Sequence, residues 1–309
     1  MSLQRTLKKQ VDLEGIGLHS GSPIRLRLLP AAPNSGIVFV RSDLPGSPEI
    51  PAHHKFVVST QLATTLGLRQ VTVSTVEHLL AALQGTQIDN VRVEVDGAEI
   101  PIMDGSAVVF YRAIQQAGIQ TQNQSRAVLA LRRKVELKMG EKWVIAEPSS
   151  CLEIHGSVEW DHPMIGYQEF HYQEGKTPFD DLAPARTFGF LKDVEMMKKA
   201  GLARGGSLDN AVVLDESSVV NPGGLRFENE FARHKVLDAL GDFKLAGIAI
   251  QGFFRLHRAG HDLHRSLLTE IFRNPDHFEI LDESSQSGQD QTRISRFQAA
   301  FVSRVVASF

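Results

Sequence analysis

Residues 74–84 read STVEHLLAALQ, and this stretch decides how the rest of the chain is interpreted. A polar start followed by an apolar run without glycine or proline predicts a helix, and the alternation of residues 90–95 predicts a strand after it. A second helix is expected at residues 106–117. Three strand-like stretches precede this unit, at residues 7–13, 24–29 and 36–40. The expected order is therefore strands, helix, strand, helix.

The second part of the chain repeats this order. We expect strands at residues 127–138, 142–147 and 152–160, a long helix at 228–245, a strand at 248–256 and a helix at 262–273. Each helix pair can cover one face of a mixed sheet. We therefore predict an α+β fold of two similar two-layer α/β sandwich domains, packed helix face to helix face. The domains are expected at residues 1–125 and 126–309, separated by a polar linker at 120–125.

An insertion distinguishes the second copy, at residues 184–221. It is helix-like at 190–200, glycine-rich at 201–206 and strand-like at 211–214. Two interpretations stay open at this point: a βαβ ornament on the surface, or a passage for something apolar. A tail begins at about residue 282, and its apolar residues at near-helical spacing predict a docked terminal helix.

Composition narrows the class of protein. The 309 residues suit two domains, because single cores stop growing at roughly 250–300 residues. A net charge of -3 argues against a nucleic-acid partner. One cysteine, Cys151, excludes an intrachain disulfide and cysteine-rich metal sites. We see no secretory signal and no apolar run of about 18 residues, so we expect a cytoplasmic monomer without a membrane span, at most in peripheral contact with a membrane.

The long helix of the second copy carries the strongest local pattern. His234 and Asp238 lie four residues apart, so they share a face and can share a metal ion, and Asp242 continues the stripe one turn later. Lys235 stands beside them. A charged helix face in water would show the same spacing. If the helix pairs pack inward, however, this stripe faces the other domain.

The equivalent first-copy helix offers Glu77 and His78. Ser74 and Glu77 fit a capping box, which would explain Glu77 without chemistry, and a lone histidine is often a core residue. Taken together, the two helices supply His78, His234 and Asp238, a three-ligand set that suits catalytic zinc with an open position. Glu77 is then placed as a general base for a zinc-bound water.

A histidine cluster follows the last expected strand. His257, His261 and His264 could form a second metal face, but Gly260 separates strand from helix and breaks that face. His261 is better interpreted as a general acid. Because a helix N-terminus disfavours an imidazolium, it needs a carboxylate partner, and Asp242 or Asp262 can supply one.

Several ordered motifs make the chain resemble a known family up to about Phe272. They are GIGLHSG at residues 15–21, STVEHLLAAL at 74–83, IPIMDGSA at 100–107, ARTFG at 185–189, LRFE at 225–228, RHKVLD at 233–238 and GH at 260–261. The family is the UDP-3-O-acyl-N-acetylglucosamine deacetylases, zinc enzymes of the committed step of lipid A synthesis. The resemblance implies zinc-dependent deacetylation of a UDP-linked acylated amino sugar, and a His2Asp set also accepts iron.

The resemblance also implies roles for residues. His78, His234 and Asp238 are the implied zinc ligands, and Glu77 is the implied base. Lys235 and Thr187 are implied to hold the oxyanion and the water, while His261, oriented by Asp242, is the implied acid. Phe188 and Arg258 are implied substrate contacts, with Arg258 suited to the diphosphate. The remaining implied substrate contacts, in the turn and in an acyl passage through the insertion, are Leu18, His19, Val194, Met197, Ala203, Gly206, Ser207, Ala211 and Val213.

This chain departs from the family around the acid histidine. The family usually has a small residue there, often followed by Leu-Asn, whereas this chain has Asp262-Leu263-His264. Arg204 also falls where an apolar residue is common. Two alternative functions remain: a zinc amidohydrolase acting on another acylated amine, and a non-catalytic metal- or lipid-binding protein on the same scaffold.

Overall fold

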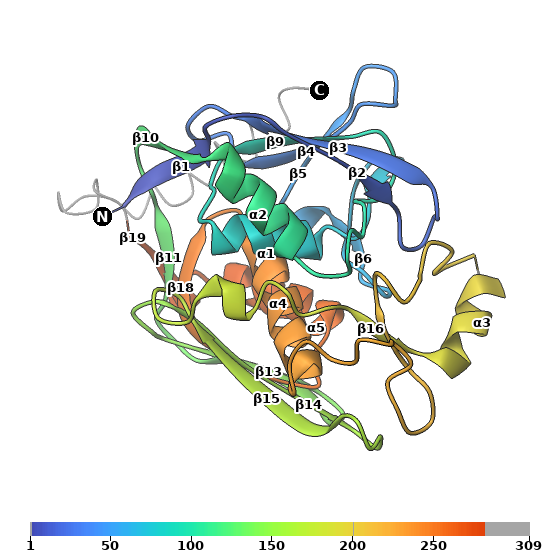
Figure 1. Cartoon of the computed structure of the whole chain (residues 1–309). Helices are drawn as coiled ribbons and strands as arrows, with labels where there is room; N and C mark the ends of the chain where they lie inside the picture. The colour runs from blue at the N-terminus through green and yellow to red at the C-terminus, as the bar shows by residue number, and fades with distance from the viewer. Residues whose placement is uncertain (1, 200, 282–309) are drawn as a thin grey trace.

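The computed structural model describes residues 2–199 and 201–281 and is built in four layers. In Figure 1 a sheet lies above α1 and α2, which lie above α4 and α5, and a second sheet lies below. The helices of the described residues are α1 (Glu77–Gly85), α2 (Val108–Ala117), α3 (Leu191–Lys199), α4 (Glu230–Lys244) and α5 (His261–Arg273). The helices therefore meet between the two sheets, as the α+β prediction requires.

The strands before residue 126 pair only among themselves in the described part of the chain. The main sheet has the order β2-β3-β9-β4-β5, in which β4 and β9 are parallel and the other neighbours antiparallel. A three-stranded sheet β6-β7-β8 and the pair β1-β10 complete this half. The strands are β1 (Leu3–Leu7), β2 (Val11–Ile16), β3 (Pro23–Pro30), β4 (Ile37–Arg41), β5 (Glu49–Pro51), β6 (Val57–Ser59), β7 (Thr65–Leu68), β8 (Val71–Val73), β9 (Val91–Val95) and β10 (Ile119–Ser125).

The second half centres on one strand, β18, which pairs with β11, β13 and β14. The path through its large sheet is β12-β13-β18-β11-β19, and β15 pairs with β14. These strands are β11 (Val128–Leu131), β12 (Val135–Met139), β13 (Lys142–Glu147), β14 (Leu152–Trp160), β15 (Gly166–Gln173), β18 (Ala249–His257) and β19 (Phe278–Leu281).

The packing of α1 against α4 forms the centre of the molecule. Every residue of α1 from Glu77 to Gln84 is buried, which explains why its sequence is apolar on nearly all sides. On α4, Gly241 lies so close to α1 that a Cβ atom there would sit 2.0 Å from the backbone oxygen of Glu77. The absent side chain therefore permits the close approach of the two helices.

The insertion contains two strands and a helix in the order strand, helix, strand. Its strands β16 (Phe188–Phe190) and β17 (Val212–Leu214) are parallel and flank α3, which has no buried residue and projects from the body in Figure 1. Its glycine-rich loop reaches the first half of the chain, where the Gly205 amide donates to the carbonyl of Leu18 at 3.0 Å. The insertion thus joins the two halves on one side.

Some sequence predictions were wrong. The expected linker at 120–125 is strand β10, which pairs with β1; its residues are mostly exposed, so an edge strand of glutamine, asparagine and threonine showed no apolar alternation. The expected strand at 127–138 is two strands, β11 and β12, with a break between them. The strand expected at 7–13 spans the end of β1 and the start of β2, and sequence reasoning missed β5 to β8, β15, β16 and β19. The predicted tail helix lies outside the described residues.

The capping box at Ser74 and Glu77 is wrong as well. The helix α1 begins at Glu77 itself, after Val76, and has no side-chain cap. The hydroxyl of Ser74 instead bonds the hydroxyl of Thr65 at 2.8 Å. Helix capping therefore does not explain the presence of Glu77 at this position. None of the helices between residues 2 and 281 that the structure describes has the length and apolar character needed to cross a bilayer.

Replacing Gly241 by alanine tests the helix contact. Alanine favours helices over glycine by about 1 kcal/mol, but a Cβ 2.0 Å from a backbone oxygen forces α1 and α4 apart. We expect Gly241→Ala to lower the free energy of unfolding by about 1–3 kcal/mol, as overpacked cores do. Denaturant unfolding measures this. Gly223→Ala, at a glycine with no atom within 4 Å of the added Cβ, is the matched control and should be neutral.

Candidate metal and catalytic site

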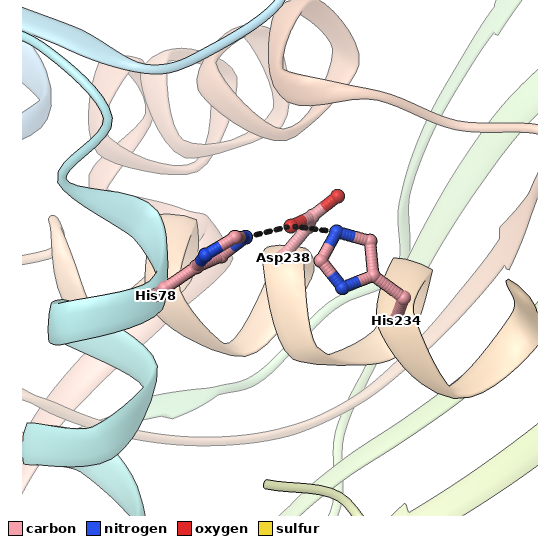
Figure 2. Close-up of side chains that lie close together, drawn as sticks. All are labelled: His78, His234 and Asp238. Carbon is pink, nitrogen blue, oxygen red and sulfur yellow. Dashed lines mark ion pairs between the residues drawn. The ribbon is translucent and has the colours of Figure 1, made fainter. Parts of the chain in front are cut away.

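Two helices from the two halves bring three ligand-type side chains together. His78 comes from α1, and His234 and Asp238 come from successive turns of α4 (Figure 2). Asp238 Oδ1 lies 3.3 Å from His234 Nε2 and 3.6 Å from His78 Nε2. One ligand atom from each residue lies within 4.8 Å of the others, and all three residues are buried. The packing of α1 on α4 therefore brings the three side chains of the predicted ligand set close together.

The hydrogen bonds and protonation states of this cluster suit a metal ion. His234 Nδ1 lies 3.1 Å from the carbonyl of Ala185, so it carries the proton and leaves the Nε2 lone pair facing Asp238. Burial lowers the pKa of His234 to about 3, which keeps the ring neutral. Burial opposes ionisation of Asp238, but His234, Lys235 and His78 hold its pKa well below the usual range. Neutral imidazoles and an ionised carboxylate are the donor set that a divalent metal requires.

Glu77 lies next to this cluster with a perturbed carboxyl group. It is buried at the first position of α1, and its Oε2 accepts a hydrogen bond from the backbone amide of Thr64 at 3.0 Å. Burial raises its pKa, and the positive charges of His261 and His78 oppose that rise only in part. A carboxylate whose pKa is raised is a stronger base than an exposed one.

His261 and Asp242 form an ion pair in which Asp242 is buried and His261 is partly buried. His261 is the first residue of α5, and its Nδ1 lies 2.7 Å from Asp242 Oδ2. Burial favours the neutral ring, but the charge and hydrogen bond of Asp242, with the charges of Glu77 and Asp238, outweigh it and raise the pKa of His261 to about 10. The same pairing lowers the pKa of Asp242 against the effect of burial. Asp242 is the carboxylate bonded to His261, so of the two partners that the sequence offered, the geometry favours Asp242.

Lys235 and Phe188 border the cluster. Lys235 Nζ donates to Asp238 Oδ2 at 2.9 Å and lies 5.6 Å from the ring centroid of Phe188. The Phe188 ring also stands edge-on to His234, with centroids 6.2 Å apart. Thr187 precedes Phe188 in the segment whose Ala185 carbonyl orients His234. These predicted site residues therefore come from one neighbourhood.

Arg258 lies elsewhere, in a cleft at the end of β18. Its guanidinium donates to Glu141 at 2.7 Å, and the cleft is also lined by Trp160, Tyr167 and His257. The positive backbone φ of 50° at Arg258 marks the sharp turn between β18 and α5. The turn thus separates Arg258 from His261, the first residue of α5.

Of the remaining predicted substrate contacts, Leu18 and His19 lie in the turn between β2 and β3, and the others lie on the insertion. Among them Leu18 faces the glycine-rich loop, since a Cβ at Gly206 would meet its side chain at 3.6 Å. His19 Nδ1 accepts from the Ala203 amide at 3.4 Å. The partly exposed residues of the set are Leu18, His19, Val194, Met197, Ala203, Gly206, Ala211 and Val213, and Ser207 is exposed.

Sequence reasoning missed Thr64 and Glu99, and it named His264 without foreseeing the contact of this residue with Asp242. The Thr64 hydroxyl donates to Asp242 Oδ1 at 2.6 Å, and His264 Nδ1 lies 2.8 Å from Asp242 Oδ2. Glu99 is buried and accepts the backbone amides of His19 and Ser20 at 2.8 and 3.0 Å, which fixes the turn beside the insertion. Glu99 directly precedes the IPIMDG motif, and this position could have marked it as a candidate site residue. Thr64 lies in a loop, and no sequence pattern marks it.

Comparison with known proteins identifies the family. The model of the LpxC family, UDP-3-O-acyl N-acetylglycosamine deacetylase, matches residues 4–273. The chain belongs to this family. Curated proteins named UDP-3-O-acyl-N-acetylglucosamine deacetylase are similar to it: one from Myxococcus xanthus is 48% identical over 90% of this chain and 89% of its own length. Another, from Campylobacter hominis, is 44% identical over 94% of this chain and 99% of its own length.

The family membership and the donor set give a prediction about metal content. We expect about one divalent ion per chain in protein purified without added metal, measured by elemental analysis. His234→Ala and Asp238→Ala should each lose the ion, because each removes one of three ligands. His155→Ala, on β14 of the outer sheet, is the control and should keep it. Full metal content in His234→Ala would contradict the assignment.

Proposed function

We propose that this chain removes the N-acetyl group of UDP-3-O-acyl-N-acetylglucosamine by hydrolysis, the committed step of lipid A synthesis. One observation carries the proposal: in a chain of this family, a metal-type cluster lies beside a basic buried carboxylate, Glu77, and a protonated imidazole, His261. Amide hydrolysis needs this division, since a base must activate water and an acid must protonate the departing nitrogen.

His78, His234 and Asp238 would hold a zinc ion, and the same nitrogen and oxygen donors would accept iron(II). When bound, such an ion supplies Lewis acidity, which makes a water more acidic and polarises a carbonyl. The residues themselves fit this group, because both Nε2 atoms face the same carboxylate oxygen of Asp238.

Glu77 is the proposed base. The Thr64 amide occupies its Oε2, which fixes the carboxylate and leaves the other oxygen for the attacking water. Because burial raises its pKa, Glu77 takes the proton of the water more readily than an exposed glutamate would. The proton then stays on a carboxyl group that is buried away from bulk solvent.

His261 is the proposed acid. The imidazolium holds one proton on Nδ1, toward Asp242, and presents the other on Nε2 for transfer to the glucosamine nitrogen. Asp242 keeps this form populated through neutral pH. Lys235 is the proposed donor to the oxyanion that forms at the acetyl carbonyl, because an ammonium has three protons and Asp238 uses one. We propose that the Thr187 hydroxyl assists it.

Substrate recognition is proposed to divide among three regions. Phe188, beside His234 and Lys235, would contact the sugar, and the insertion together with Leu18 and His19 would enclose the 3-O-acyl chain. Arg258 would bind the diphosphate as a bidentate donor, which requires exchanging its bond to Glu141 for phosphate oxygens.

The acetate assay tests the function. We expect wild-type protein to release acetate from UDP-3-O-acyl-N-acetylglucosamine and to lose most of that rate when the acyl group is absent. Glu77→Gln and His261→Ala should each lower kcat by about 10²–10⁴-fold, the usual contribution of a general base or acid. Elemental analysis should find their metal content unchanged. Metal-loaded wild-type protein without turnover would refute the proposal.

The pH profile tests the pairing of His261 with Asp242. The imidazolium, present below the raised pKa of about 10, is lost as pH rises through that value. Asp242→Asn removes the charge that raises the pKa but keeps an oxygen that can accept from Nδ1, so burial then dominates and lowers the pKa. We expect the alkaline limb of kcat/KM to move to lower pH. An alkaline limb that stays in place would assign it to another group.

A further inference from the structure

Asp242 shares one carboxylate oxygen between two imidazoles. Its Oδ2 lies 2.7 Å from His261 Nδ1 and 2.8 Å from His264 Nδ1, while its Oδ1 accepts from Thr64 at 2.6 Å. The acid function proposed above uses only the first of these contacts. His264 is therefore a buried, hydrogen-bonded group next to the reacting residues that has no assigned role.

The position of His264 is fixed by the fold. It lies three residues after His261 on α5, so the two rings project from the same face of the helix. His264 is 1% exposed, and its ring stands edge-on to Phe243 with centroids 5.4 Å apart. The packing thus holds its Nδ1 toward Asp242, because a ring enclosed in this way has little freedom to turn.

We propose that His264 is a positioning residue for the acid His261, acting through the carboxylate of Asp242. The inference rests on the proposed acid role of His261. His264 and Thr64 each donate to one oxygen of Asp242, and together they fix the carboxylate plane. A carboxylate held at both oxygens presents a fixed acceptor to His261 Nδ1 and so fixes the direction in which Nε2 points.

His264 also divides the charge of the carboxylate. A hydrogen bond to Oδ2 draws negative charge toward His264 and leaves less for the imidazolium of His261. The charged and titratable groups near His261 include Glu77 on α1, Asp238 on α4 and Asp262 in the first turn of α5. His54 and Arg265 line the same small cavity as His261. Against this excess of carboxylates, the shared bond keeps His261 from holding its proton too firmly to transfer it.

A second metal ion is the competing interpretation, since Asp242, His261 and His264 are also close enough to bind one. The contacts favour hydrogen bonds. Both Nδ1 atoms approach the same oxygen at donor–acceptor distance, and an Nδ1 that carries a proton has no lone pair for a metal. The experiment below includes this case.

The test replaces His264 in the full chain loaded with zinc. His264→Phe keeps a ring against Phe243 but removes the donor, whereas His264→Asn keeps one N–H donor for Asp242. Imidazole NMR titration without substrate reports the pKa of His261, and acetate release across pH reports kcat and KM. For His264→Phe we expect the pKa of His261 to rise by about 0.5–1 unit, the worth of one hydrogen bond.

We also expect kcat of His264→Phe to fall about 5- to 10-fold with little change in KM, and the asparagine variant to recover most of both effects. Leu267→Ala, at a buried position on the same helix, should lower Tm without moving the pKa of His261. Should the phenylalanine variant fail to fold, His264→Leu is measured in its place.

Three outcomes would overturn the proposal. The first is an unchanged pKa of His261 in His264→Phe, and the second is equal loss of activity in the asparagine and phenylalanine variants. The third is a second zinc ion that wild type binds tightly and His264→Phe loses. The NMR titration does not depend on turnover. A wild-type protein without acetate release therefore refutes the deacetylase function, while an unmoved pKa refutes the positioning role.

Discussion

The close packing of α1 on α4 is the constraint on which the site depends. Gly241 lets the backbone of Glu77 approach α4 directly, and the two helices come from different halves of the chain. Because the backbone of Glu77 meets α4 at a residue without a side chain, the distance between the axes of α1 and α4 has little freedom to vary. His78 is thereby held within 3.6 Å of Asp238, a distance that neither half could set alone. The ligand set is a product of the interface rather than of either sheet.

The same interface shifts the pKa values of three buried carboxyl groups in different directions. Glu77, Asp238 and Asp242 are all buried, and burial opposes the charge of each. Asp238 and Asp242 are offset by Lys235 and His261 at hydrogen-bond distance, so their pKa values fall. Glu77 has only a backbone amide of Thr64 and more distant cations, so its pKa rises. At equal burial, the proximity of a cation therefore decides whether the pKa of each carboxyl group falls or rises.

The sequence predicted those parts of the fold and site that local spacing encodes. Helix periodicity located α1, α4 and α5, and the four-residue spacing of His234 and Asp238 on α4 found the metal cluster once the helices were taken to face each other. Sequence reasoning did not predict edge strand β10, because an exposed strand needs no alternation of apolar and polar residues. Thr64 escaped because its contact with Asp242 spans 178 residues of sequence. What sequence reasoning missed is mostly what tertiary contact alone creates.

The turn at Leu18 and His19 is hydrogen-bonded on one side to Glu99 and on the other side to the insertion. Glu99, buried just beyond β9, accepts two amides of this turn and also the Thr75 hydroxyl, just before α1 begins. The far side of the turn bonds the insertion, through the Leu18 carbonyl and Gly205. One carboxylate thus ties the start of the helix bearing Glu77 and His78 to the loop proposed to enclose the acyl chain. The hydrogen bonds of Glu99, with that of Gly205, therefore connect this loop to the segment that precedes α1, across the two halves of the chain.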